Sequence, residues 1–302
     1  MSDIAFDRDF DPVPGLTAVL SPLVRRVVCD NPGPFTFKGT STYIVGRGEV
    51  AIIDPGPSDE AHLAALLAAV AGETVSHILV THTHMDHAPL AAELQKHTGA
   101  PILAYAIPEN ATADDEGHRL DAAVARDFVP DVVLADGQVV EGKGWTLETV
   151  FTPGHMSSHA AYALKEERSL FSGDHVMAWA TSVIAPPDGN MGQYFWALRR
   201  LLEREDDIYY PGHGPEKRNP KPLVRAFLAH RRMREEAIIK RIRENGATTI
   251  PDIVKTSYAG LDPRLYGAAG LSTLAHIEHL IEQGRVSAVE GSGADGLYRL
   301  TA

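Results

Sequence analysis

The sequence contains a single cysteine, Cys29, among 302 residues, so it cannot form an internal disulfide framework. One free thiol is compatible with a reducing compartment. A lone cysteine outside any spaced motif is more often a packing residue than a metal ligand, and we interpret Cys29 as packing.

Long apolar runs are also missing. No stretch approaches the ~18 apolar residues that a membrane helix needs. The first residues are acidic, whereas a secretory signal has a basic segment followed by an apolar one. There is no internal repeat and no low-complexity tract. We therefore expect a cytoplasmic location and no membrane partner.

Positive charge is scarce in the first two thirds of the chain. The net charge is −12, with acidic residues dominating 1–216 and basic residues in excess over 217–302. This change of sign suggests two units with different surfaces, although two solvated faces would look the same. We call the basic residues that begin the second unit the basic strip: Lys217, Arg218, Lys221, Arg225, Arg231, Arg232, Arg234, Lys240, Arg241 and Arg243.

Residues 1–216 alternate short β-branched runs with Ala- and Leu-rich stretches. The pattern predicts helices at 61–71 and 90–97. It predicts strands at 42–45, 50–53, 78–80, 101–104, 145–151, 160–164, 169–171 and 208–210. Strands mixed with helices in this way indicate a layered α/β fold.

Residues 217–302 have a different pattern. Helices are predicted at 223–245, 251–257 and 271–283, followed by a hairpin of strands at 285–289 and 297–300. This is the element order of a winged helix. We therefore predict a catalytic domain over 1–216 and a small winged-helix-like domain over 217–302.

The strongest chemical signal lies between Thr81 and His87. His82 and His84 directly follow an apolar strand, and residues two apart in extended backbone point to the same side. Asp86 and His87 come next, where the chain turns towards a predicted helix. Isolated histidines are more often packing or surface residues, but three histidines and one aspartate within six residues predict a metal site.

Three further candidates each sit in a short glycine-containing turn after a predicted strand. These are His155, Asp174 and His213. Glycine allows the backbone to approach a site closely, and a short turn fixes the side chain that it carries. Each turn alone could be purely structural. Together with the first cluster they give five histidines and two aspartates.

At these residues the sequence resembles the metallo-β-lactamase superfamily, whose fold is a four-layer αβ/βα sandwich with metals at the sheet edges. The resemblance implies that His82, His84 and His155 bind one metal. It implies that Asp86, His87 and His213 bind a second and that Asp174 bridges both. The cofactors would be two divalent ions, with zinc favoured and manganese or iron as alternatives. Asp54 would orient a ligand imidazole, although a turn cap is an alternative.

Several segments resemble the β-lactamase-like protein 2 branch of this superfamily more closely. They are residues 31–36, 39–45, 210–215 and 230–235, together with the winged-helix tail. Ser41 stands where this branch is expected to have Asn, and Ala88-Pro89 stand where glyoxalase II has Gly-Gly. These departures concern specificity rather than metal binding.

The resemblance implies a hydrolase in which a hydroxide bridging two metals attacks an ester, thioester, lactone or related acyl bond. Asp86 would orient this nucleophile and take up its proton. An alternative is a single-stranded RNA endoribonuclease that uses the basic strip. The acidic first domain and the lack of interleaved aromatic residues oppose it. An iron-dependent oxygenase is known on this fold and stays open.

A sequence-specific DNA reader is disfavoured, because residues 271–283 carry Glu278 and Glu282 and no lysine or arginine. The sequence makes no prediction of oligomeric state. His159 could contact the site or be a strand histidine with a backbone partner, and His175 is expected to face away. Tyr194, in a predicted pocket-covering loop at 186–194, could donate to an oxyanion but more often such a residue packs.

Overall fold

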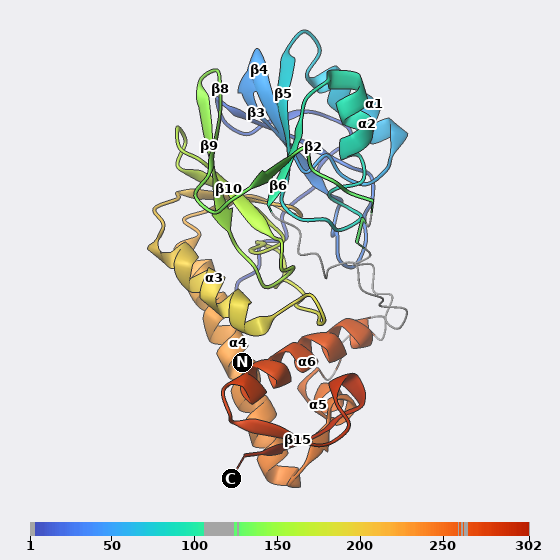
Figure 1. The fold of residues 1–302 in the computed structure, drawn as a ribbon, viewed down its shortest axis with the longest axis vertical. Helices are drawn as coiled ribbons and strands as arrows, with labels where there is room; N and C mark the ends of the chain where they lie inside the picture. Colours follow the sequence, from blue (N-terminus) through green and yellow to red (C-terminus); the bar gives the residue numbers. More distant parts are fainter. Residues whose placement is uncertain are drawn as a thin grey trace.

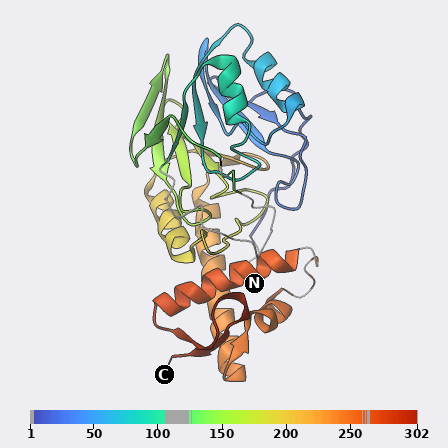
Figure 2. The same ribbon diagram turned by 45° about the vertical axis from the view of Figure 1, so that its right-hand side comes forward.

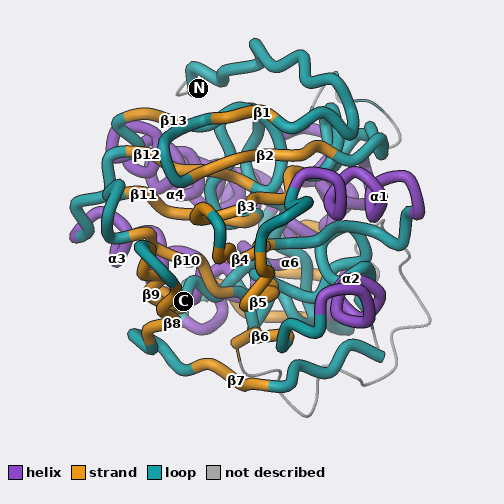
Figure 3. The backbone as a smooth tube through the Cα atoms, turned by 90° about the horizontal axis from the view of Figure 1, so that it is seen from above, coloured by secondary structure: helices purple, strands orange, loops and turns teal. Residues whose placement is uncertain are grey.

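The computed structural model describes residues 4–105, 124–125, 127–258, 260, 262 and 265–301. Two sheets face each other, with helices on the outer face of each (Figure 3). The first sheet has the strand order β1-β2-β3-β4-β5-β6-β7. Its strands are β1 Ala18–Val19, β2 Val24–Val28, β3 Ser41–Arg47, β4 Glu49–Ile53, β5 Thr74–Val80, β6 Ile102–Tyr105 and β7 Val132–Leu134.

The second sheet has the order β13-β12-β11-β10-β9-β8. Its strands are β8 Val139–Gly142, β9 Trp145–Phe151, β10 Ala160–Leu164, β11 Ser169–Gly173, β12 Ile208–Pro211 and β13 Lys217–Arg218. In the first sheet β4 to β7 pair in parallel, and in the second β11 and β12 do. Between the sheets lies an apolar core that includes Tyr43, Trp145 and Phe171.

Helices α1 (Glu60–Ala69) and α2 (Ala91–Thr98) cover the first sheet (Figure 1). Helix α3 (Met191–Glu203) and the first half of α4 (Lys221–Asn245) pack on the second. Strand β4 and the second half of β5 are therefore buried on both faces, which explains the apolar runs at 50–53 and 78–80. The layers follow the predicted αβ/βα sandwich, so the predicted fold class is confirmed.

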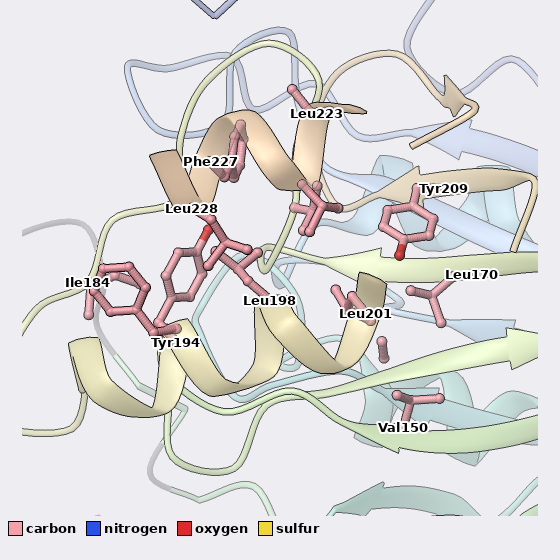
Figure 4. Close-up of a cluster of buried hydrophobic side chains, with 14 of the residues drawn as sticks. Val150, Leu170, Ile184, Tyr194, Leu198, Leu201, Tyr209, Leu223, Phe227 and Leu228 are labelled. Carbon is pink, nitrogen blue, oxygen red and sulfur yellow. The ribbon is translucent and has the colours of Figure 1, made fainter. Parts of the chain in front are cut away.

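The packing of α3 on α4 is shown in Figure 4. Tyr194 and Leu198 of α3 lie in one buried cluster with Phe227 and Leu228 of α4. The predicted loop at 186–194 is wrong at its end, because Asn190 accepts a hydrogen bond from the Gln193 backbone amide and starts α3 there. Tyr194 is consequently a helix residue.

The tail continues with β14 (Thr248–Thr249), α5 (Ile250–Ser257), α6 (Tyr266–Glu282), β15 (Val286–Glu290) and β16 (Leu297–Leu300). This confirms the predicted helix, helix, helix, hairpin order, although α6 begins earlier than expected. The tail lies below α3 in Figures 1 and 2. Its core includes Ile238 and Ile242 from the second half of α4. Helix α4 is thus shared by both cores, and the division after residue 216 stays a prediction.

None of the helices in the described part of the chain is both long and apolar enough to cross a membrane.

We expect Phe227→Ala to lower the free energy of unfolding by about 3–5 kcal/mol, because the ring is 0% exposed between α3 and α4. Urea denaturation measures this change. Met233→Ala on the same helix is the matched control, since Met233 is 39% exposed and its loss should cost about 0.5 kcal/mol or less. Equal effects of the two substitutions would contradict the packing described.

Candidate metal centre

The candidate ligands lie where strands end. His82 and His84 follow β5, His155 follows β9, Asp174 follows β11 and His213 follows β12. The structure brings all seven predicted residues together in one buried region, in three overlapping groups whose ligand atoms lie within 4.8 Å of one another. No predicted site residue lies apart from the others.

The first group consists of His82, His84 and His155. His84 Nδ1 lies 3.0 Å from His82 Nε2 and 3.1 Å from His155 Nε2. The three ring nitrogens therefore converge on one point, as three imidazole ligands of a single ion would.

The second group consists of Asp86, His87 and His213. His213 Nε2 lies 3.1 Å from Asp86 Oδ2 and 3.3 Å from His87 Nε2. Asp86 Oδ2 lies 3.6 Å from His87 Nε2. This group offers two nitrogens and one carboxylate oxygen to a common point.

Asp174 lies between the two groups. Its Oδ2 is 3.4 Å from His213 Nε2 and 3.9 Å from His155 Nε2, and its Oδ1 is 3.5 Å from His87 Nε2. Oδ1 is buried and has no hydrogen-bond partner in the described structure. A buried, unsatisfied carboxylate oxygen is costly, and a cation between the groups would satisfy it.

Four imidazoles are fixed from outside the cluster through Nδ1, and for His82 the partner is Thr81 Oγ1 at 3.0 Å. His87 Nδ1 lies 2.9 Å from Asp54 Oδ2, His155 Nδ1 lies 2.6 Å from the Val183 carbonyl, and His213 Nδ1 lies 3.3 Å from the Gly39 carbonyl. When Nδ1 donates to an oxygen, Nε2 is left with its lone pair facing the cluster. These contacts confirm the predicted partnership of Asp54 with a candidate ligand.

The charge of the cluster supports a cation site. Among the described residues, Asp86 and Asp174 form ion pairs only with histidines and with no lysine or arginine. Buried carboxylates are normally paired or coordinate a metal. The donor set therefore fits two divalent ions, one in each group.

In the metal-free protein, bound protons balance the negative charge of the two carboxylates. Burial alone would lower the pKa of His87 and His213, but the carboxylates around them outweigh it, chiefly Asp86 for His87 and Asp174 for His213. The pKa of His87 is raised well above its usual value, and that of His213 is raised to about 9. Burial lowers the pKa of His84 to about 3 and that of His82 well below its usual value, so these two imidazoles are uncharged at neutral pH.

Two glycines allow the close approach. A Cβ on Gly212 would lie 2.5 Å from Asp174 Oδ1 and 2.6 Å from His87 Cε1. A Cβ on Gly154, which has a φ of +126°, would lie 2.5 Å from the backbone of Tyr194. Both turns next to candidate ligands therefore require glycine.

The structure shows the surroundings of His159, His175 and Tyr194. His159 Nδ1 lies 2.9 Å from Thr152 Oγ1, and its Nε2 accepts from the Asp174 backbone amide at 3.2 Å, so it has the backbone partner expected. His175 is buried, and its ring nitrogens have no partner among the described residues. Tyr194 is buried and donates to the His175 carbonyl at 2.9 Å, so it packs rather than facing a substrate.

The Gly39 and Val183 carbonyls could not be found from the sequence, because a backbone acceptor leaves no mark on residue type. Thr81 was not predicted either, and its backbone amide and hydroxyl donate to the Asp54 carboxylate at 2.7 and 2.8 Å. A hydroxyl residue directly before the histidine motif was the available signal.

Two family models match the chain: one described as metallo-beta-lactamase superfamily over residues 35–213, and one described as beta-lactamase associated winged helix domain over 249–294. The beta-lactamase-like protein 2 homolog of Caenorhabditis elegans is 33% identical over 256 residues, 82% of each chain. The atrochrysone carboxyl ACP thioesterase of Aspergillus fumigatus is 31% identical over 261 residues, 80% of this chain and 76% of that protein.

Among solved structures, a beta-lactamase domain protein from Burkholderia ambifaria has a similar fold. Its TM-score is 0.81 at 22% identity, covering 98% of this chain and 97% of that one. The shared fold extends over both the sandwich and the tail.

Asp54→Asn should weaken zinc binding by ~10–100-fold, because the amide no longer holds the His87 imidazole as a carboxylate does. Asn tolerates the φ of +52° at this position, so the fold should persist. Competition with a chromophoric chelator measures the affinity. Asp59→Asn is the control, since Asp59 caps α1 and Asn caps equally well. Unchanged affinity in Asp54→Asn would contradict this role.

Metal binding should release at least one proton at pH 7. The raised pKa values of His87 and His213 mean that this pair holds a proton in the metal-free protein, and a ligand nitrogen must lose it. Affinity should therefore rise with pH up to about 9, the pKa of His213. Calorimetry in buffers of different ionisation enthalpy counts the protons. A binding enthalpy independent of buffer would rule out this exchange.

Proposed function

The chain belongs to the metallo-beta-lactamase superfamily of metal-dependent hydrolases, and we propose that it uses two divalent ions to cleave an ester, thioester, lactone or related acyl bond. The main support for the proposal is that Asp174 lies between two groups, each with three side chains whose ligand atoms converge. Zinc is the favoured metal because imidazole nitrogens dominate the donor set, and manganese and iron are the alternatives.

We assign His82, His84 and His155 to the first ion, and Asp86, His87 and His213 to the second, with Asp174 shared. The distances of 3.0 to 3.9 Å between ligand atoms across the groups support this assignment. Bound as a pair, such ions supply a Lewis acid and a water that ionises near neutral pH.

Asp86 is the residue proposed to handle the proton. Its side chain is 22% exposed, and the neighbouring Met85 is 42% exposed, so the cluster faces solvent on this side. Burial would raise the pKa of Asp86, but His87 and His213 outweigh it and hold the pKa well below the usual range. The carboxylate is therefore ionised and can accept a hydrogen bond from a water entering from solvent, which orients the water for the proposed proton transfer.

The acyl class is supported by the relatives. The Aspergillus fumigatus relative is named atrochrysone carboxyl ACP thioesterase, and it aligns with 80% of this chain. We therefore place thioesters first among the acyl substrates to be tested.

The basic strip gives less support to RNA cleavage than its sequence suggested. Arg231 is buried, Lys221 pairs with Glu205 at 2.7 Å, and the Arg234 guanidinium lies 4.2 Å from the Tyr258 ring centroid. The strip is thus not a continuous row of free cations for phosphates. Single-stranded RNA is kept as the alternative substrate and as an arm of the test.

The tail is poorly placed to read DNA. Helix α6 corresponds to the helix that a winged-helix DNA reader places in the major groove. Here Ala275 of α6 belongs to the core cluster of α3, and His279 packs on Phe195 with ring centroids 5.1 Å apart. We therefore propose no sequence-specific DNA partner.

His84→Ala should lose metal and activity together, with metal affinity falling by more than ~100-fold, because one of three imidazoles at the first ion is removed. Metal content after dialysis measures the loss. His97→Ala is the control, since His97 lies exposed on α2 away from the cluster. Retention of both metal and activity in His84→Ala would refute the assignment.

The metal-loaded protein should hydrolyse members of a panel of acyl thioesters and lactones, and dialysis against a chelator should abolish turnover. Labelled single-stranded RNA is incubated in parallel at low and high salt. RNA cleavage that falls steeply with salt, without acyl turnover, would replace the acyl proposal with the nuclease alternative.

A further inference from the structure

Arg231 of α4 differs from the rest of the basic strip because it is only 3% exposed. It forms no ion pair with any aspartate or glutamate in the described ranges, and its Nε has no hydrogen-bond partner there. A buried charge without a counter-charge is costly, so the fold must hold this guanidinium in place through other contacts.

Two contacts hold it. One NH2 group of Arg231 donates to the carbonyl of Ser182, and the guanidinium carbon lies 5.2 Å from the centroid of the Tyr194 ring. A cation over an aromatic face is attracted by the ring, most strongly where water is excluded. Figure 4 shows Tyr194 on α3 pointing towards α4.

Glu235 lies one helical turn beyond Arg231, but in the described structure its carboxylate contacts His279 Nδ1 at 2.7 Å and forms no ion pair with Arg231. Burial, with a smaller contribution from the charge of Arg231, lowers the pKa of His276 to about 4 against the opposing effect of Glu235. The histidine that faces Arg231 from α6 is therefore neutral. Within this pocket the Ser182 carbonyl and the Tyr194 ring are the groups that stabilise the guanidinium.

The segment that Arg231 holds leads directly to the metal centre. Val183 follows Ser182, and its carbonyl is the group that lies 2.6 Å from His155 Nδ1. The hydroxyl of Ser182 donates to the His175 carbonyl at 2.9 Å, and Tyr194 donates to the same oxygen at 2.9 Å. His175 follows Asp174. Residues 182 and 183 therefore support both a candidate ligand of the first ion and the candidate bridging carboxylate.

We propose that Arg231 is a positioning residue: by fixing the 182–183 segment it sets the orientation of His155 and Asp174 towards the metals. A helix shared with the tail then helps to shape the catalytic centre. This inference rests on the proposed function, since it concerns the same metal ligands. Lysine cannot replace Arg231, because an ammonium lacks the planar face that stacks on Tyr194 while donating to a carbonyl.

The test uses the full chain with Arg231→Met, Arg231→Lys and Tyr194→Phe, each compared with the wild type. Zinc stoichiometry and affinity are measured by chelator competition, and the visible spectrum of the cobalt-loaded protein reports ligand geometry. All three variants should bind the weaker ion with ~10–100-fold lower affinity and show an altered cobalt spectrum. In the thioester assay, kcat should fall more than KM rises.

Arg232→Met is the matched control for metal affinity, because Arg232 is the exposed neighbour on the same helix. Wild-type affinity and spectrum in a folded Arg231→Met or Arg231→Lys protein would overturn the inference, as would an equal effect of Arg232→Met. Arg231→Lys keeps the buried charge, so it decides the question if Arg231→Met does not fold. Tyr194→Phe keeps the ring under Arg231 and removes only the hydroxyl that donates to the His175 carbonyl, so wild-type behaviour of this variant would overturn the part of the inference that concerns Asp174. A wild-type protein that binds no metal would instead refute the proposed function.

Discussion

The site depends on one constraint: buried donor atoms converge, and no cationic side chain of the described residues lies among them. Two carboxylates, Asp86 and Asp174, lie within 4 Å of histidine nitrogens, and no lysine or arginine of the described chain pairs with either. Such an arrangement is stable only when protons or metal ions balance the charge. The raised pKa values of His87 and His213 and the unsatisfied Asp174 Oδ1 have this single cause.

The rest of the sandwich holds these atoms still. The ligands follow the ends of strands in both sheets, where the backbone is fixed by pairing on either side. Gly154 and Gly212 have no side chain, so the turns that carry candidate ligands can lie close to Tyr194 and to Asp174. Carbonyls and Asp54 then lock the imidazoles, so that little reorganisation is needed when ions bind. Helix α4 extends this support into the tail through Arg231.

Much of this site could be predicted from the sequence because its ligands lie in short motifs after apolar strands. The spacing of the apolar residues predicted most strands and helices, and for β9, β10 and β16 the predicted bounds match the observed ones. Helix α3 was not predicted, since the Pro- and Gly-rich segment before it hid the Asn190 cap. The Gly39 and Val183 carbonyls could not be predicted, as any residue supplies one. Arg231 was grouped with exposed cations because charge alone does not report burial.

In the proposed metal centre, two ions occupy the two donor groups and share Asp174. Crystals of the metal-loaded protein, measured at the absorption edge of zinc, test this arrangement most directly by anomalous scattering. We expect two peaks, ~3.5–4 Å apart, one contacting His82, His84 and His155 and the other Asp86, His87 and His213, with Asp174 touching both. A single peak, or peaks outside these residues, would contradict it.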